Sequence, residues 1–184
     1  MGRIIFLTNM ERQHLMLEKA RAGVVLAGMQ ADGRMVLLSD AVPWGTEWQK
    51  TFKASDIVIF TWMGSGLDTA FLKKSAAFLR KQKITHAMLI SDPDAGELSY
   101  GVSPQDKEQL QKYLSYGGVE NFHQFWRWLA RTYCREAIPV QEPEPLPWHG
   151  IYHPRTQGPF TGLAEYRAAF CRSDRPTIGL LLYR

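Results

Sequence analysis

The sequence predicts an α/β protein with a parallel sheet, on three grounds. In the first two thirds of the chain, short apolar runs alternate with segments that have the periodicity of helices. The apolar runs are continuous, as is typical of strands buried on both faces of a sheet. Strands that alternate with helices form βαβ units, and the right-handed crossover restricts how these units connect. We therefore expect a flavodoxin-like or Rossmann-like parallel sheet with flanking helices over residues 1–135.

Four strands are expected in this region. The clearest is Asp56–Trp62, which reads DIVIFTW and is rich in β-branched and aromatic residues. The others are Arg3–Thr8, Met35–Ser39 and His86–Ser91. The first of these is too short to be a secretory signal and reads instead as a buried strand.

The expected helices are Glu11–Arg21, Gly45–Lys53, Leu67–Lys83, Ser103–Tyr116 and Glu120–Tyr133. In the fourth, Ser103 can cap the first turn and Pro104 suits the first helical position. Gly117-Gly118 ends that helix. The aromatic residues of the fifth recur at helical spacing, and we expect them in the core rather than around a cofactor.

The composition changes after Glu136. Six of the ten prolines fall between Pro139 and Pro159, and they exclude a helix there because proline lacks the N–H donor and restricts its neighbours. Residues 136–184 are therefore expected to form a second region. It would contain a stiff connector that lies on another part of the protein, a short helix at Gly162–Cys171 and a terminal strand at Thr177–Tyr183.

The terminal strand is apolar on both faces, and no covering helix follows it in the sequence. It reads as the first strand of a truncated further domain, so the chain is expected to be one piece of a longer protein. An exposed apolar strand tends to pair with another edge. This predicts a possible homo-oligomer through residues 177–183.

Composition and charge exclude several classes of protein. The chain has 184 residues with 22 basic and 18 acidic side chains, spread so that no basic patch for nucleic acid is indicated. No apolar run is long enough to cross a membrane. Cys134 and Cys171 are far apart, and without a secretory signal they are expected to be reduced thiols in a cytoplasmic protein.

One glycine-rich loop is similar in its setting to phosphate-binding loops. Gly64-Ser65-Gly66 follows a strand and precedes a helix, and such a loop can offer backbone N–H groups to a phosphate. Thr69 replaces the third glycine of the dinucleotide-binding pattern, so a tight turn is favoured. After the first strand, Glu11 would repel a flavin phosphate, and we expect no flavin. An enzyme that uses this loop for a phosphorylated substrate is one alternative.

No metal site and no catalytic residue is expected. Asp92, Asp94 and Glu97 could hold a divalent cation through their oxygens, but their spacing favours a solvated loop. His149 and His153 are four residues apart, but neighbouring glycine and proline argue against a helix and therefore against zinc-helix geometry.

Three segments, taken together, resemble a known family. They are residues 113–122 (YLSYGGVENF), 147–154 (PWHGIYHP) and 175–184 (RPTIGLLLYR). In this order and approximate spacing they are similar to the N-terminal region of the large subunit of cobaltochelatase and magnesium chelatase. The resemblance covers about residues 56–184, and the first 55 residues resemble the family only in the pattern of their elements.

The resemblance implies an ATP-dependent tetrapyrrole metal chelatase. Such large subunits bind a tetrapyrrole ring and insert Co²⁺ or Mg²⁺ into it, helped by ATPase partner subunits. Residues 150–154 (GIYHP) look more like the cobalt branch, which acts in cobalamin biosynthesis. The chain would then be the non-catalytic N-terminal portion of a much longer subunit, without a cofactor of its own and inactive alone.

The resembling segments contain four ligand-binding candidates: Glu120, Asn121, Tyr152 and His153. Glu120 can cap a helix or share a metal with His123, and the structural role is favoured. Tyr152 and His153 could face a tetrapyrrole or metal, or pin the connector to the sheet. The alternative function, from another class, is a flavodoxin-like binding or regulatory module for a small ligand or protein partner.

Overall fold

The computed structural model describes residues 2–38, 43–63, 69–90, 98–145, 150, 151, 153, 155, 156 and 160–171. The chain forms two compact units, residues 1–145 and residues 146–184. Each unit is considered by itself. No helix in the described part of the chain is long and apolar enough to span a membrane.

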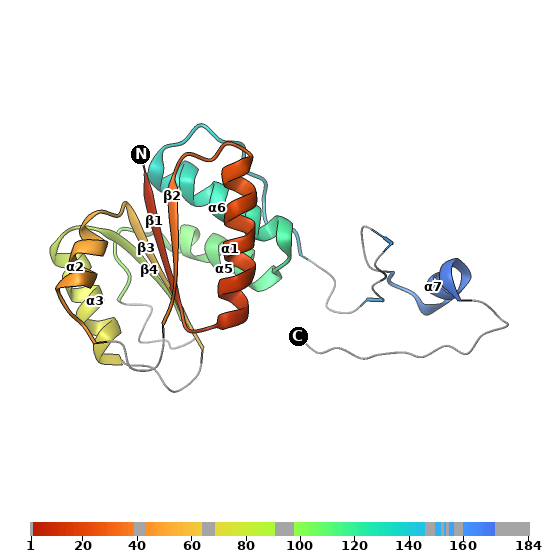
Figure 1. Ribbon diagram of the computed structural model, residues 1–184, viewed down its shortest axis with the longest axis horizontal. Coiled ribbons are helices and arrows are strands. Elements are labelled where there is room, and N and C mark those ends of the chain that lie inside the picture. The colour runs from red at the N-terminus through yellow and green to blue at the C-terminus, as the bar shows by residue number, and fades with distance from the viewer. Residues whose placement is uncertain are drawn as a thin grey trace. The chain divides into compact units, whose positions relative to one another are not determined.

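The first unit is built on a parallel sheet. Its described strands are β1 (Arg3–Thr8), β2 (Asp32–Leu37), β3 (Ile57–Trp62) and β4 (Thr85–Ile90), in the order β2-β1-β3-β4 (Figure 1). Every neighbouring pair is parallel, and Ile5 of β1 is paired with Arg34 on one side and Val58 on the other. The order matches the start of the flavodoxin-like arrangement. The predicted fold class is therefore confirmed.

Helices cover both faces of this sheet. One face carries α1 (Glu11–Leu26), α5 (Pro104–Tyr116) and α6 (Val119–Cys134), and the other carries α2 (Thr46–Lys53) and α3 (Thr69–Lys81) (Figure 1). Because consecutive strand residues face opposite sides, Ile4 and Phe6 join the core under α1, α5 and α6. Ile5 and Leu7 join the core under α2 and α3. This double burial explains why the strands read as continuous apolar runs.

Aromatic side chains fill both cores. The rings of Phe6 and Phe125 meet edge to face, with their centroids 5.7 Å apart, and the indole N–H of Trp126 donates to the carbonyl of Leu17 at 2.9 Å. The aromatic stripe of α6 therefore packs in the core, as expected. On the other face, Trp44 contacts Phe52, Phe71 and Phe78, with centroid separations of 6.0, 5.9 and 5.7 Å.

The ends of α5 agree with the capping residues in the sequence. The Ser103 hydroxyl accepts a hydrogen bond from the Asp106 N–H at 3.0 Å, and Pro104 occupies the first turn. Gly117 and Gly118 have φ values of 64° and 83°, which favour glycine. The double glycine therefore ends α5 and lets the chain reverse into α6.

Two elements of the first unit differ from their predicted bounds by three residues or more. β2 begins at Asp32 rather than Met35, because Asp32-Gly33-Arg34 pairs with β1 although these residues are poor strand formers. Gly33 is required by close packing, since a Cβ there would lie 2.9 Å from Arg21 Cδ and 3.0 Å from Trp126 Cζ3. Likewise α1 continues to Leu26, because its packing against α6 extends it past its weak apolar pattern.

The proline-rich connector begins within the first unit. Ile138 and Val140 pack against the core beneath α1, α5 and α6, so that unit reaches Pro145 rather than the expected boundary at 135. In the described part of the second unit, an antiparallel bridge joins Ile151 and Phe160, and α7 spans Leu163–Phe170. The expected strand at Thr177–Tyr183 lies outside the described residues.

Candidate functional site

Asn121 joins three segments of the first unit. It lies in the first turn of α6 and is 5% exposed. Its Nδ2 donates to the carbonyls of Gly117 at 2.7 Å and Glu144 at 2.8 Å, and its Oδ1 accepts from the Glu144 N–H at 2.9 Å. Every polar atom of the amide is used within the protein. Asn121 therefore fixes the connector and the α5–α6 turn and presents no group to a ligand.

Three neighbouring side chains hold the connector in the same way. The Gln124 Oε1 accepts from the Gln141 N–H at 3.0 Å, and the Tyr113 hydroxyl donates to the Gln141 carbonyl at 2.6 Å. Gln109 Nε2 donates to the Glu142 carboxylate at 2.6 Å. Because prolines leave the connector with few backbone donors, these side chains supply its hydrogen bonds. We call Gln109, Tyr113, Asn121 and Gln124 the connector clasp.

Glu120 lies on the exposed side of the same helix turn. Its carboxylate accepts from Gln124 Nε2 at 2.7 Å and lies 3.4 Å from His123 Nδ1. The hydrogen bond from Gln124, more than the nearby His123, lowers the pKa of Glu120. Glu120 therefore orients a member of the clasp. In the part of the chain that the structure describes, no group of three or more His, Cys, Asp and Glu side chains could hold a metal ion.

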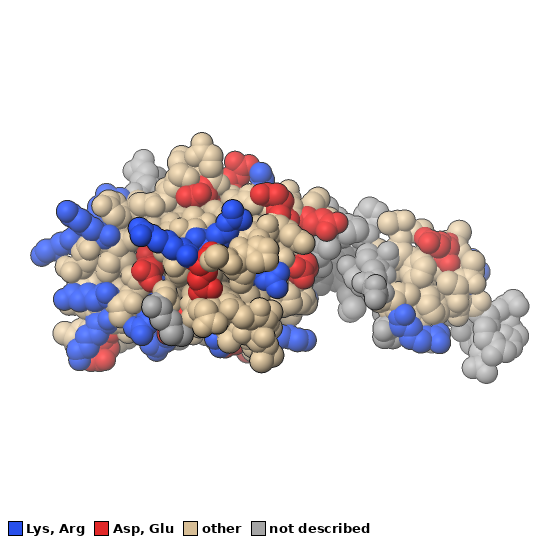
Figure 2. Space-filling model, turned by 90° about the horizontal axis from the view of Figure 1, so that it is seen from above, with Lys and Arg blue, Asp and Glu red and all other residues tan. Residues whose placement is uncertain are grey.

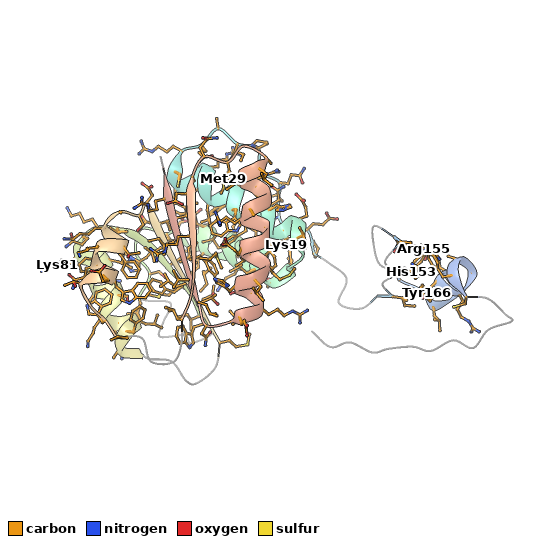
Figure 3. All side chains as sticks on the ribbon, viewed as in Figure 1. Lys19, Met29, Lys81, His153, Arg155 and Tyr166 are labelled. Atoms are coloured by element: carbon orange, nitrogen blue, oxygen red, sulfur yellow. The ribbon has the colours of Figure 1, made fainter. Side chains whose placement is uncertain are left out.

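His153 lies in an aromatic cluster of the second unit. Its ring stacks on Phe170 with centroids 3.8 Å apart and an interplanar angle of 16°. Tyr166 and Phe160 contact Phe170 at 5.7 Å each, and the Arg155 guanidinium lies 5.1 Å from the centre of the same ring. His153, Arg155 and Tyr166 lie together beside α7 (Figure 3). We call these five residues the aromatic cluster.

The hydrogen bonding of His153 sets its chemistry. Its Nδ1 accepts from the Arg155 N–H at 3.3 Å, so the neutral ring carries its proton on Nε2. In that tautomer Nε2 is a hydrogen-bond donor. The cluster thus offers flat aromatic surface, one N–H and one guanidinium. Tyr152, the neighbouring candidate, lies outside the described residues.

The carboxyl edge of the sheet is the usual ligand site of such folds, at the point between β1 and β3 where the strand order reverses. Here the Asn9 Nδ2 donates to the Met63 carbonyl at 2.9 Å, and the Met63 N–H donates to Asn9 Oδ1 at 3.1 Å. Gln13 Oε1 accepts from the hydroxyls of Thr8 and Thr61 at 3.2 and 2.7 Å. These polar groups are engaged with one another across the two strand ends.

The remaining sequence candidates fall mostly outside the described residues. These are the loop Gly64-Ser65-Gly66, the acidic residues Asp92, Asp94 and Glu97, and His149. Glu11 is exposed at the first position of α1. The structure thus describes three of the four ligand candidates. It shows Glu120 and Asn121 together in the first unit, and His153 in the second.

Sequence reasoning missed most of the connector clasp. Tyr113 begins one of the resembling segments and Gln124 lies outside them, but neither pointed to the connector, because an isolated polar residue in a helix gives no hint of a partner 28 or 17 positions away. The one available signal was the proline-rich stretch itself. Its unsatisfied carbonyls require donors from the surface on which it lies.

Comparison with known proteins gives concordant matches. Residues 111–184 match the family model described as CobN/Magnesium Chelatase. The chain is 32% identical over 93 residues to the aerobic cobaltochelatase subunit CobN of Pseudomonas aeruginosa. The aligned residues are 50% of this chain and 7% of that protein. An uncharacterised protein of Methanocaldococcus jannaschii is 31% identical over 83 residues, or 42% of this chain and 6% of that protein.

A solved structure shares the fold. The catalytic subunit of cobaltochelatase from Mycobacterium tuberculosis superposes with a TM-score of 0.57 at 16% identity, covering 83% of this chain and 12% of that chain. The present chain therefore spans only a small part of the length of each protein that it matches.

Proposed function

The chain carries a CobN/magnesium chelatase-like region, and from this we propose that it serves as the N-terminal, non-catalytic portion of a chelatase large subunit. In this proposal the substrates are Co²⁺ and a tetrapyrrole, the product belongs to cobalamin biosynthesis, and ATP is hydrolysed by partner subunits. The cobalt branch is favoured over the magnesium branch because the curated relative of known activity is a cobaltochelatase subunit.

The observation that carries the non-catalytic role is the connector clasp. The family match begins within α5 and includes Tyr113, Asn121 and Gln124, whose polar atoms bond to the protein itself. A catalytic or metal-binding role would need polar atoms free to reach a substrate. Tyr113, Asn121 and Gln124 instead fix the path of the connector along the first unit.

The aromatic cluster is the part of the chain suited to touch a tetrapyrrole. A macrocycle is flat and aromatic or partly so, and it stacks on rings such as those of His153 and Phe170. Arg155 supplies a positive charge for an anionic substituent, and Nε2 of His153 supplies a donor. Tyr152, which precedes His153 in the sequence, is proposed as a further contact.

The second candidate function is a flavodoxin-like binding or regulatory module. The strand order favours it, since such sheets bind ligands where the order reverses. The mutual hydrogen bonds of Asn9 with Met63 argue against it, because a ligand there would have to displace them.

Two measurements test the proposed function. A chimera in which residues 111–184 replace the matching segment of the Pseudomonas aeruginosa subunit should retain ATP-dependent cobalt insertion into a metal-free corrin precursor, followed by absorbance. A chimera that folds and assembles but inserts no cobalt contradicts the proposal. The purified chain alone should insert none, with or without ATP, and insertion by it would contradict the non-catalytic role.

A further inference from the structure

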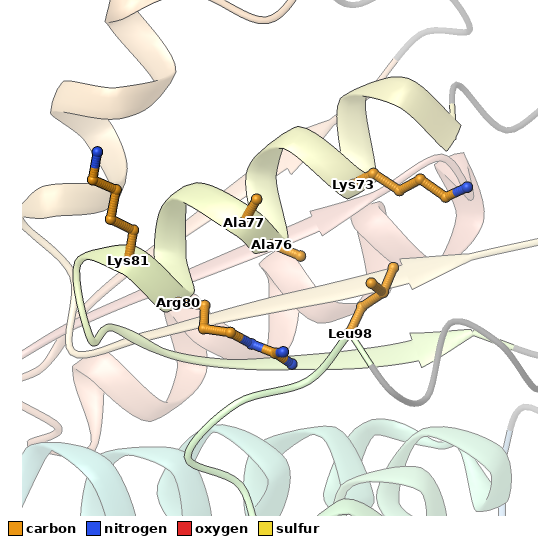
Figure 4. Close-up of a pocket in the computed structure, with 6 residues that line it drawn as sticks. All are labelled: Lys73, Ala76, Ala77, Arg80, Lys81 and Leu98. Carbon is orange, nitrogen blue, oxygen red and sulfur yellow. The ribbon is translucent and has the colours of Figure 1, made fainter.

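A hollow lies beside α3 in the first unit, and the residues that line it are not among the candidates discussed so far. Its volume is about 460 Å³, and it is lined by Lys73, Ala76, Ala77, Arg80, Lys81 and Leu98 (Figure 4). This volume falls within the range of small-molecule sites, roughly 300–1,000 Å³. The side chains of Ala76 and Ala77 are small, so they leave the space beside α3 open.

The hollow has an apolar floor with a cation toward each end. Lys73 and Arg80 are seven residues apart, two turns along the same face of α3, and both extend toward the side on which Leu98 lies (Figure 4). Ala76 and Ala77 come between them on the helix. Lys81 points the other way and contributes only its stem.

The wall opposite α3 is held in place by hydrogen bonds. The carbonyl of Leu98 lies 2.8 Å from Nε2 of the buried His86, and the Ser99 hydroxyl accepts from the Met88 N–H at 3.0 Å. Arg80 Nη2 donates to the Ser99 carbonyl at 3.2 Å, which ties the helix to this wall. The hollow is therefore formed before any ligand arrives, and binding costs little ordering of the protein.

The charged side chains of α3 are all basic. α3 carries Lys73, Lys74, Arg80 and Lys81 and contains no Asp or Glu. Among the residues that the structure describes, no salt bridge involves Lys73 or Lys81. Lys and Arg side chains gather at the end of the unit that α2 and α3 form (Figure 2). A ligand in the hollow thus meets positive charge next to apolar surface.

We propose that this hollow binds a small carboxylate with an apolar body. The body would lie on Ala76, Ala77 and Leu98, and the carboxylate would take a charge-assisted hydrogen bond from Lys73 with Arg80 beside it. A phosphate fits less well, because the lining residues of α3 lie in its middle and at its end rather than at its N-terminus. The proposal is independent of the chelatase function.

The test is a titration of the full, ¹⁵N-labelled chain with naphthoate, followed by amide chemical shifts. Saturable shifts are expected at residues 73–81 and 98–99. Lys73→Gln, and Ala77→Leu, which fills the hollow, should each weaken binding about fivefold or more. The matched control is Lys74→Gln, which removes an equal charge one position away from the lining and should change the affinity less than about twofold.

Each alternative result overturns the proposal. If Lys73→Gln and Lys74→Gln weaken the binding of naphthoate equally, the anion is attracted to the basic face of α3 as a whole and not to the hollow. Equal binding of neutral naphthamide would remove the role of charge, and equal binding of inorganic phosphate would remove the role of the apolar body. Absence of saturable shifts would mean that there is no site. The spectrum of each variant reports its folding, so lost binding is separated from unfolding.

Discussion

Asn121 and Glu144 are joined by two hydrogen bonds, one donated by the Asn121 side chain at 2.8 Å and one accepted by it at 2.9 Å. A side-chain amide here pairs with the backbone of Glu144 as a neighbouring strand would. The same Nδ2 also donates to Gly117, so one residue links the end of α5, the start of α6 and the connector. This accounts for an asparagine three residues after Gly118.

Asn121→Ala should destabilise the first unit by about 2–3 kcal/mol, because three hydrogen bonds are lost and buried backbone groups are left without partners. Urea unfolding measures the loss, and hydrogen exchange should show faster exchange of the Gln141 and Glu144 amides. Gln111→Ala, which removes an exposed amide side chain of α5 outside the clasp, is the control and should cost less than about 0.5 kcal/mol. Equal effects of both substitutions would show that the clasp does not hold the connector.

His86 should make the protein less stable in acid. Burial, with a smaller contribution from Arg80, lowers the pKa of His86 from 6.5, although the carbonyls of Ile84 and Leu98 act in the opposite direction. The unfolded chain then binds the proton more tightly than the folded one. The free energy of unfolding should therefore fall as the pH drops below about 6.5 and be insensitive to this group above it.

Urea unfolding of the wild type and His86→Asn at about pH 8 and about pH 5 checks this linkage. Asparagine can still donate a hydrogen bond to one of the two carbonyls, but it does not titrate. The free energy of unfolding of His86→Asn should therefore fall less between these two pH values than that of the wild type. If the stability of His86→Asn falls as much in acid as that of the wild type, His86 is not the cause of the pH dependence.

Cys134 should react slowly in the folded protein. Burial first, and then the charges of Asp56 and Glu136, raise the pKa of its thiol from 9.0 to about 11. Because the thiolate is the reactive form, native Cys134 should be modified about a hundredfold more slowly than in denaturant at the same pH. The rate is measured in a Cys171→Ser background, so that one thiol remains. Equal rates in the two states would contradict the burial of Cys134.

Gly33→Ala should destabilise the unit by about 1–3 kcal/mol, because the new methyl group must displace Arg21 and the fully buried Trp126. Thermal unfolding, with indole fluorescence as the probe of Trp126 packing, measures the effect. Gly45→Ala is the matched control, since Gly45 has extended backbone angles and a Cβ added there would meet nothing within 4 Å. If Gly33→Ala leaves the thermal stability unchanged, α1 packs less closely on β2 than described.

The sequence alone determined the fold class and most elements, because their signals are local. Arg3–Thr8 was predicted at its observed bounds, since its central residues Ile4–Leu7 form the continuous apolar run that burial on both faces requires. Pro104 and Gly117 marked the ends of α5 for reasons that lie within one turn of the helix. The motif containing Asn121 likewise pointed to the family, although not to what the residue does.

Only the tertiary structure decided the contacts between segments distant in the chain. Asp32-Gly33-Arg34 has low strand propensity, and its pairing with β1 outweighs that propensity. The partners of Asn121 and Tyr113 lie 23 and 28 residues further along the chain, and no local pattern specifies them. The hollow beside α3 depends on where Leu98 is held by β4. The physical reason is that hydrogen bonds and packing between distant segments depend on how the folded layers meet, whereas periodicity and capping depend on neighbours in sequence.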